Sequence, residues 1–326
     1  MKYLITGGAG FIGSHLTESL LADRHAVTVI DDFSTGSPEN LAAVKDHPQL
    51  TVIEEDILAG DRLEKAVAAS DCVVHLAAAV GVELVVHDPV RTLVTNVHGS
   101  ERVLTFAANG GKRCILASTS EVYGKSTKPF FKETDDLCIG PSVNSRWSYA
   151  CSKLLDEFFL MALYRDRQLP GTVVRFFNTV GPRQTGRYGM VLPRFAAAAL
   201  ANRPLPVYGT GNQTRCFCHV HDVVRALRLL IPREDSYGKV FNIGTARRIS
   251  IGNLAKLVIE RAGSSSGIEI IPYEKAYEPG FEDMLNRAPD CNAIKALCGW
   301  EPEIELEQII DDVIAFQRSK LAKEEK

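Results

Sequence analysis

The sequence has no apolar run of the length that spans a membrane, for which about 20 consecutive apolar residues are needed. It also has no large excess of charge, since 37 Lys and Arg stand against 40 Asp and Glu, a formal net charge of −3. Such mixed charge excludes a strongly basic surface for nucleic acid or for an anionic membrane. We therefore expect no nucleic-acid partner and no membrane partner.

Signs of secretion are missing as well. The eight cysteines are scattered singly through apolar segments, which indicates reduced thiols rather than a disulfide framework. The first predicted strand begins at Lys2, so we expect no room for a signal peptide. No internal repeat is present. These features predict a cytoplasmic globular protein of one large domain or two closely packed ones, as 326 residues allow.

The opening stretch MKYLITGGAGFIGS organises the rest of the chain. A short β-prone run, 3–6, leads into three glycines spaced G-x-x-G-x-x-G and then into apolar residues with helical spacing. A strand that turns tightly into a helix presents unpaired N–H groups and a positive dipole end to a pyrophosphate. The predicted contacts with the cofactor in this turn are Gly7, Gly10, Phe11, Ile12 and Gly13.

A second predicted strand, 26–30, ends in Asp31, which lies 18 residues after Gly13. A carboxylate at this point of a dinucleotide fold binds the adenosine ribose hydroxyls and repels a 2′-phosphate. The order of strand, turn, helix, strand and acid therefore predicts NAD rather than NADP as the cofactor.

Strands and helices alternate through the first half, which predicts an α/β fold with a Rossmann-type doubly wound parallel sheet. Small residues after the strand 72–76 allow close approach of the cofactor, although tight helix packing explains them equally well. A long helix is expected from about 90 to 109. The further candidate cofactor contacts are Asp56, Ile57, Leu76, Ala77, Ala78, Asn96 and Ser118.

The second half changes character, with frequent proline and glycine between 170 and 211. Segments 171–177 and 217–231 are still predicted to belong to the sheet of the first domain and to the layer that covers it. We predict a Rossmann domain over 1–177 plus about 216–241. A smaller C-terminal α/β lobe is predicted over about 178–215 plus 242–326.

Tyr149 and Lys153 lie four residues apart at the start of a helical stretch, which places both on one face. A nearby ammonium favours the phenolate, so we expect Lys153 to lower the pKa of Tyr149. The spacing also occurs by chance, and Asp156 or Glu157 is a possible ion partner for the lysine. Because this tyrosine–lysine motif follows an NAD-type turn, it indicates an active site more strongly than the spacing does alone.

A hydroxyl cluster, Ser118, Thr119 and Ser120, ends the fifth predicted strand, where strand ends face the ligand crevice. These hydroxyls suit contact with a substrate oxygen and with Tyr149. The alternative is an ordinary turn at the end of the strand. Glu121 follows, and a carboxylate there needs a proton-handling role, a charged partner or a capping role.

Together these motifs resemble the extended short-chain dehydrogenase/reductase family of nucleotide-sugar epimerases, dehydratases and decarboxylases over nearly the whole chain. The residues that carry the resemblance are TGGAGFIGSH (6–15), DDFSTG (31–36), HLAA (75–78), STSEVYG (118–124), YACSK (149–153), RFFNTVGPR (175–183), YGTGNQTRCF (208–217) and GW (299–300).

The resemblance implies that Tyr149 takes a proton from a sugar hydroxyl, usually at C4, while hydride passes to NAD and a 4-keto sugar forms. Lys153 would orient the nicotinamide ribose, and Thr119 would support the sugar oxygen. After a second step, hydride usually returns to the same sugar. The smaller lobe would bind the nucleotide sugar, a UDP-sugar, through Asn178, Arg215 and Arg287.

The second step is suggested by Ser120 and Glu121. Dehydratases carry Asp-Glu there, whereas UDP-glucuronate decarboxylases carry Thr-Ser-Glu with an arginine in a Q-x-R-x-F context, as at Arg215. We therefore predict UDP-glucuronate decarboxylation to UDP-xylose or a related product. The segments 31–41 and 186–195 look more like UDP-sugar 4-epimerases, the main alternative. A non-catalytic NAD-binding module is the remote one, disfavoured by the intact Tyr149, Lys153 and Thr119.

Two further patterns bear on metal binding and on assembly. The cluster Cys216, Cys218, His219, His221 and Asp222 resembles metal ligands by type. A strand over 215–220 would separate the cysteines from the histidines, and Asp222 would cap the helix 223–231, so no metal is expected.

The helix after Tyr149 carries an apolar face too broad for a surface helix, formed by Leu154, Leu155, Phe158, Phe159 and Ala162. Family members pair this helix and the 90–109 helix across a two-fold axis. A homodimer is therefore expected, with plain core packing as the alternative.

Overall fold

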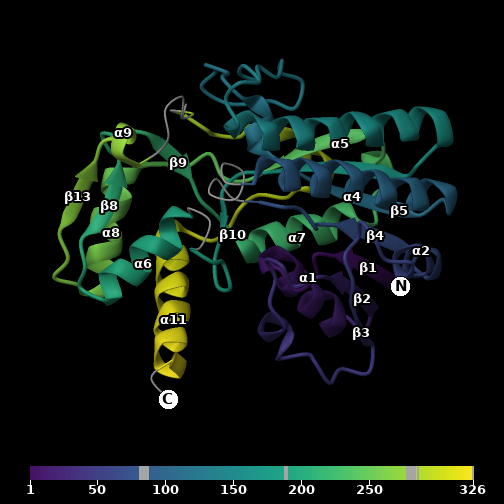
Figure 1. Ribbon diagram of the computed structural model, residues 1–326, viewed down its shortest axis with the longest axis horizontal. Helices are drawn as coiled ribbons and strands as arrows, with labels where there is room; N and C mark the ends of the chain where they lie inside the picture. Colours follow the sequence, from purple (N-terminus) through teal and green to yellow (C-terminus); the bar gives the residue numbers. More distant parts are fainter. Residues whose placement is uncertain (81–87, 187–189, 277–283, 285, 325–326) are drawn as a thin grey trace.

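The computed structural model describes residues 1–80, 88–186, 190–276, 284 and 286–324. A large sheet with helices on both faces lies beside a smaller lobe, and the chain passes between them several times (Figure 1). Residues 187–189, part of the segment that resembles the 4-epimerases, lie outside the described residues.

The main sheet has seven strands, all paired in parallel. The order reverses direction beside β1, which is the arrangement of a doubly wound fold with its ligand crevice at the carboxyl ends. From edge to edge the strands are β11 (Lys239–Ile243), β6 (Gly171–Phe176), β5 (Arg113–Thr119), β4 (Cys72–His75), β1 (Lys2–Thr6), β2 (Ala26–Asp31) and β3 (Leu50–Glu54).

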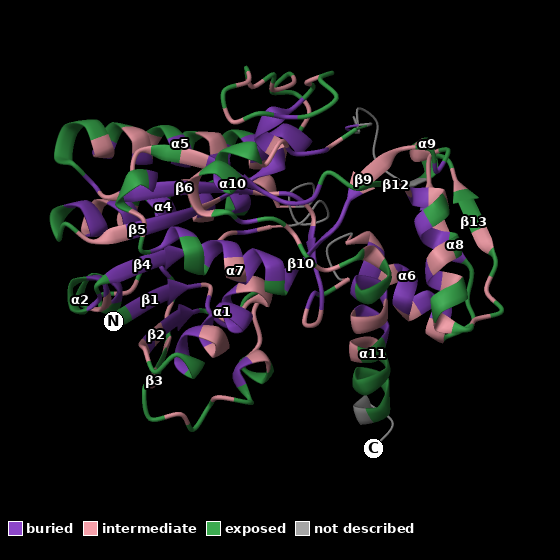
Figure 2. Ribbon diagram, turned by 180° about the vertical axis from the view of Figure 1, so that it is seen from behind, coloured by how far each residue is buried: buried purple, intermediate pink, exposed green. Residues whose placement is uncertain are grey.

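Two hydrophobic layers enclose this sheet because successive side chains of a strand point to opposite faces. The central strands β1 and β4 are largely buried (Figure 2). In β1, Tyr3 and Ile5 pack into one layer and Leu4 into the other. The first layer is covered by α1 (Phe11–Ala22), α7 (Val220–Leu230) and α10 (Asn292–Cys298). The second is covered by α2 (Arg62–Ala69), α4 (Pro89–Asn109) and α5 (Arg146–Arg167).

The smaller lobe has its own core of buried aliphatic side chains. Its helices are α6 (Val191–Leu200), α8 (Ile251–Ala262), α9 (Tyr273–Ala276) and α11 (Leu306–Glu324). Its strands form three pairs: β8 (Leu205–Tyr208) with β13 (Ile268–Ile271), β9 (Thr214–Cys216) with β12 (Arg248–Ser250), and β7 (Thr179–Val180) with β10 (Cys218–His219). The short helices of the chain are η1 (Pro38–Leu41), η2 (Ser120–Tyr123) and η3 (Glu234–Ser236).

The sheet extends further along the sequence than the predicted boundary at residue 241. That boundary falls within β11, whose pairing with β6 runs through Ile243. Ile294 and Trp300, assigned by sequence to the smaller lobe, are fully buried in the core beside the sheet. The late segment returns to the sheet because Trp300 donates its indole N–H to the carbonyl of Asp222 in α7, at 2.9 Å.

The strand and cap expected around Asp222 differ in the structure. The strand breaks at Phe217 between β9 and β10, and α7 begins at Val220 with His219 as its cap. Asp222 is therefore inside the helix. Its carboxylate is buried and accepts the backbone N–H groups of Glu303 and Ile304, each at 3.0 Å, so it fixes the returning chain instead of capping.

Helix α5 buries charge and exposes apolar side chains. Lys153, Asp156 and Glu157 are buried, whereas Leu155 is 51% exposed and Phe158 is 65% exposed. Core packing therefore does not account for the outer half of the predicted apolar face. Among the described residues, no helix combines the length and apolarity needed to cross a membrane.

Candidate active site

A cavity of about 1290 Å³ opens at the carboxyl ends of the sheet strands and is closed on its other side by the smaller lobe. It contains every site residue predicted from the sequence except Asn96. The predicted residues that line it are Gly7, Gly10, Phe11, Ile12, Gly13, Asp31, Asp56, Ile57, Leu76, Ala77, Ala78, Ser118, Thr119, Ser120, Glu121, Tyr149, Lys153, Asn178, Arg215 and Arg287.

The glycine turn forms the floor of one end of the cavity. Gly7 has a φ of 70°, and a Cβ on Gly13 would stand 2.3 Å from the carbonyl oxygen of Gly7. Helix α1 starts at this turn with no side-chain cap and no acid in its first turn. Its positive dipole end is thus available to a pyrophosphate, and the turn fits NAD.

Asp31 lines the adjoining part of the cavity. Its two carboxylate oxygens accept the backbone N–H groups of Ala9 and Phe33, each at 2.9 Å. Burial raises the pKa of Asp31, although these hydrogen bonds oppose the shift. A carboxylate fixed in this way fits a ribose diol and disfavours a 2′-phosphate, which agrees with NAD.

Asn96 lies outside the cavity wall. From α4 it receives the backbone N–H of Ala79 at 2.8 Å and donates to the hydroxyl of Ser152 at 3.1 Å. It is 1% exposed. Asn96 therefore supports the loop after β4 that lines the cavity, and it joins that loop to α5.

Tyr149 is placed by β5 and η2. Its phenol forms a hydrogen bond with Thr119, and Thr119 also caps η2 by accepting the N–H of Glu121 at 3.2 Å. Burial and the negative charge of Glu121 raise the pKa of Tyr149. The pKa is thus raised and not lowered as expected from Lys153, whose ammonium is itself paired with Asp156.

The ammonium of Lys153 contacts the carboxylate of Asp156 at 2.8 Å, and both side chains are almost fully buried. Of the two acids considered from the sequence, Asp156 is thus the partner. Glu157 is instead paired with Arg175 at 2.7 Å and accepts the hydroxyl of Ser118. Arg175 was not predicted; its position on β6, facing α5, explains how Glu157 is buried.

Glu121 has two charged partners. Arg146 contacts it at 3.2 Å, and Arg287 donates to its other oxygen. Burial raises the pKa of Glu121, but Arg287 and Arg146 outweigh that effect and lower it to about 2. Glu121 is therefore ionised and does not hold a proton here. Arg146 was not singled out from the sequence, although its position one helical turn before Tyr149 is a usable signal.

The three predicted substrate contacts meet at the lobe side of the cavity. Asn178 donates to the carbonyl of Cys216 at 2.9 Å and accepts Arg287 at 3.0 Å. Arg215 donates to the carbonyls of Thr214 and Met284, each at 2.8 Å, and its charge also acts on Glu121. Three guanidiniums, with Arg146, thus surround one carboxylate. The excess positive charge fits an anionic ligand.

The cluster that resembles metal ligands does not form a metal site in the structure. Within the described ranges, no group of three or more His, Cys, Asp or Glu side chains is arranged to hold an ion. Cys216, Cys218 and His219 are buried, whereas His221 is exposed.

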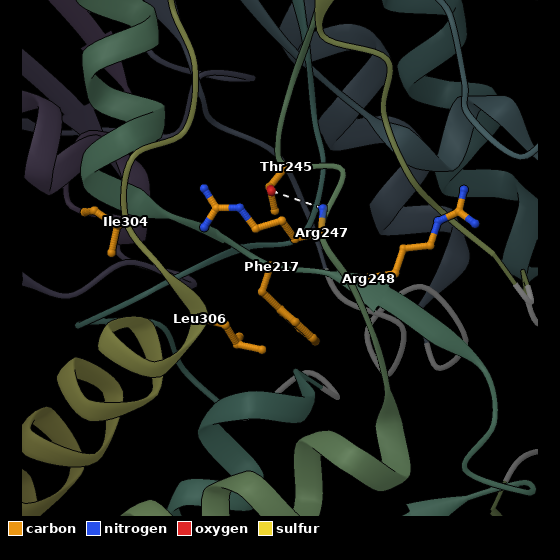
Figure 3. A pocket seen from close by; sticks show the side chains of 6 residues that line it. All are labelled: Phe217, Thr245, Arg247, Arg248, Ile304 and Leu306. Carbon is orange, nitrogen blue, oxygen red and sulfur yellow. Dashed lines mark hydrogen bonds between the residues drawn. The ribbon is translucent and has the colours of Figure 1, made fainter.

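A smaller cavity of about 40 Å³ adjoins the site, and Phe217 lines both cavities (Figure 3). The guanidiniums of Arg247 and Arg248 point to opposite sides of it. Arg247 is paired with Glu305, and Arg248 lies over the ring of Phe130, 4.6 Å from its centroid. Both arginines that line this small cavity therefore already have a partner within the protein.

The site combines a glycine turn after β1, an acid at the end of β2, and a tyrosine and a lysine on α5. Together these features define a dinucleotide-dependent enzyme of the short-chain dehydrogenase/reductase type. The sequence profile of the NAD-dependent epimerase/dehydratase family matches residues 3–244. The chain belongs to this family, and NAD is its cofactor.

The relatives include decarboxylases and epimerases of UDP-sugars. The chain is 42% identical to a UDP-N-acetyl-α-D-glucosaminuronate decarboxylase of Bacillus cytotoxicus, over 97% of this chain and 98% of the relative. It is 34% identical to UDP-glucuronic acid decarboxylase 1 of Xenopus tropicalis, over 98% and 73%. A solved UDP-glucose 4-epimerase of Thermotoga maritima is 31% identical, with a TM-score of 0.87 and coverage of 98% and 100%.

The glycine turn gives a direct test of cofactor fit. We expect Gly13→Ala to abolish or strongly weaken NADH binding, because its Cβ would collide with the Gly7 carbonyl and displace the turn. Gly267→Ala is the control, since a Cβ there meets nothing within 4 Å. NADH fluorescence titration measures both. Equal affinity of the two variants would contradict this account of the turn.

Proposed function

We propose that the chain is an NAD-dependent decarboxylase of a UDP-hexuronic acid. It would act through a transient 4-keto sugar and return the hydride to the same sugar. The observation that carries the proposal is the ionised Glu121 held by Arg146 and Arg287 beside Tyr149. The two guanidiniums and the one carboxylate leave net positive charge near the reacting sugar. An acidic sugar can bind to this charge, whereas a neutral hexose has no anionic group that would do so.

Similarity supports an acidic sugar too. Both decarboxylase relatives are named for a UDP-hexuronic acid, and the higher identity belongs to the one named for the 2-acetamido sugar. We therefore extend the predicted substrate, UDP-glucuronate, to UDP-N-acetylglucosaminuronate, and propose the latter as the preferred one.

The first step would be oxidation at C4. Tyr149, oriented by Thr119 and acting as the phenolate, would take the proton of the C4 hydroxyl, and Lys153 would orient the nicotinamide ribose. Gly7, Gly13 and Asp31 would hold the cofactor. When bound, NAD would supply the acceptor for the hydride and its source when the hydride is returned.

The second step would be loss of CO₂. A C4 ketone lies β to the C6 carboxylate and accepts the electron pair of the breaking C5–C6 bond, so positioning and electrostatics are sufficient. Guanidiniums bound tightly to the substrate carboxylate would oppose its conversion to neutral CO₂. Glu121 neutralises part of the charge of Arg146 and Arg287, and we infer that this keeps their hold on the substrate weak.

The alternative function is 4-epimerisation of a UDP-sugar, favoured by the structural likeness to the Thermotoga maritima enzyme. An epimerase needs the same tyrosine, lysine and glycine turn. It returns the hydride to the other face of the sugar and has no evident use for Glu121 between two arginines.

A substrate panel separates these functions. The protein is incubated with UDP-N-acetylglucosaminuronate, UDP-glucuronate and UDP-glucose, and the products are analysed by mass spectrometry and NMR. We expect loss of CO₂ from the uronates, faster from the acetamido sugar, and no change in UDP-glucose. A product of unchanged mass inverted at C4 would establish the epimerase instead.

Glu121→Gln should slow decarboxylation more than oxidation. Without the carboxylate, Arg146 and Arg287 would pair with the substrate carboxylate and hold it against leaving. Loss of the same charge lowers the pKa of Tyr149 and assists the oxidation. We expect turnover to fall about 100-fold, while the NADH absorbance formed on substrate addition persists. Equal losses in both measurements would show that Glu121 has no special part in the second step.

We also propose a homodimer formed through α4 and α5. On these two packed helices, Val90, Val94, Leu155 and Phe158 are exposed apolar side chains. Large apolar side chains exposed on two packed helices are typical of a subunit interface. The eight free thiols support our further proposal of a reducing, cytoplasmic location.

Phe158→Asp tests the dimer, because a charge buried in an apolar interface is costly. We expect the wild type to be a dimer at micromolar concentration by light scattering and the variant to be a monomer. Val143→Asp serves as the control, since Val143 is 87% exposed and lies in the turn before α5, outside both helices. A monomeric wild type would overturn the proposal.

A further inference from the structure

A line of buried polar side chains crosses from α5 to the end of β1. It contains Lys153, Asp156, Ser100, His75 and Thr6, and each of these residues is at most 2% exposed. Buried polar groups outside the reacting centre need a structural or functional reason, since each one costs desolvation unless it is paired. Each member of this line is paired with the next.

The hydrogen bonds have one consistent direction. Asp156 accepts both the ammonium of Lys153 and the hydroxyl of Ser100 at one oxygen, each at 2.8 Å. Since Ser100 uses its only proton on Asp156, it accepts from Nε2 of His75 at 3.0 Å. Nδ1 of His75 then accepts the hydroxyl of Thr6 at 2.6 Å.

This direction requires a neutral His75 with its proton on Nε2. Burial and the charge of Lys153 lower the pKa of His75 to about 3, so the ring is neutral near pH 7. The carboxylate of Asp156 is therefore held by an uncharged chain of hydrogen bonds through Ser100 and His75, in addition to its ion pair with Lys153.

Both ends of the line reach the cofactor cavity. Lys153 lines it directly, and Thr6 immediately precedes Gly7 and receives the N–H of Ala77 at 3.4 Å. Gly7 and Ala77 also line the cavity. The position of Lys153 is thus tied to the two strand ends that border the predicted pyrophosphate site.

We propose that Asp156 is a positioning residue: oriented by Ser100 and His75, its carboxylate places the ammonium of Lys153 for the cofactor and sets the charge felt by Tyr149. This inference rests on the function proposed above. Asp156 touches neither the sugar nor the cofactor cavity and acts through Lys153.

The groups that act on the phenol of Tyr149 come from several elements. Thr119 and Glu121 face it from β5 and η2, Arg287 from the lobe side, and Asp156 from its own helix. Asp156 is faced by Lys153 and Glu157 on α5, Ser100 on α4 and, through Ser100, His75 on β4. Both Glu121 and Asp156 favour the neutral phenol, so removing the charge of Asp156 favours the phenolate.

The test is Asp156→Asn, which keeps the size of the side chain and removes its charge. In the pH profile of kcat/KM, the acid limb that reports Tyr149 should move to lower pH by about 0.5–1 unit. NADH binding, measured by fluorescence in the absence of a sugar substrate, should weaken about fivefold because Lys153 loses its anchor. If Asp156 only filled space, Asp156→Asn would not shift the acid limb of the pH profile.

Two variants isolate the effect. Ser100→Ala keeps the charge of Asp156 but removes part of its support, so NADH binding should weaken without a shift of the limb. Asp311→Asn makes the same chemical change in an exposed ion pair with Arg261 and should alter neither measurement. If Asp156→Asn does not fold by circular dichroism, Asp156→Ser replaces it with the same expectation.

The outcomes separate this inference from the function itself. A wild type that turns over no UDP-sugar counts against the proposed function, whereas NADH binding still tests the placement of Lys153. An active wild type whose acid limb or NADH affinity is unchanged in Asp156→Asn would overturn the positioning role.

Discussion

The structure depends on the compensation of charge buried beneath α5. A helix that turns Lys153, Asp156 and Glu157 toward the protein interior is stable only if each charge finds a partner there. Asp156 neutralises Lys153, and Arg175 from β6 neutralises Glu157. These pairs fix α5 against the sheet and thereby place Tyr149 at the carboxyl ends of its strands. The same orientation leaves Leu155 and Phe158 exposed on the outer face, so site and proposed interface share one cause.

The cavity divides electrostatically into two regions. At the glycine turn, the uncapped start of α1 provides a partial positive charge for a diphosphate, and Asp31 provides a carboxylate for a ribose. At the lobe side, Arg146, Arg215 and Arg287 surround the single carboxylate of Glu121. A dinucleotide suits the first region, and the anionic nucleotide sugar proposed above suits the second. Tyr149 and Lys153 lie where the two regions meet.

Local patterns made much of the cofactor side predictable. The turn from β1 to α1 requires glycine for steric reasons, and Asp31 follows a short apolar strand, so neighbouring residues alone identify both. The partners of Glu121 were not predictable in the same way. Arg146 and Arg287 are distant in sequence and meet at one carboxylate only after folding. The direction of the Tyr149 pKa was mispredicted because burial of the phenol and the charge of Glu121 raise it, and both depend on the folded structure.

The sequence by itself determined the alternating elements, the glycine turn, the NAD-type acid and the tyrosine–lysine pair, because each depends on residues close together in the chain. Only the tertiary structure decided that β11 completes the sheet, that Trp300 returns to its core, and which charges neutralise one another. Those features depend on contacts between residues far apart in the chain. Burial and charge compensation, which decide such contacts, are properties of the folded molecule and not of any local segment.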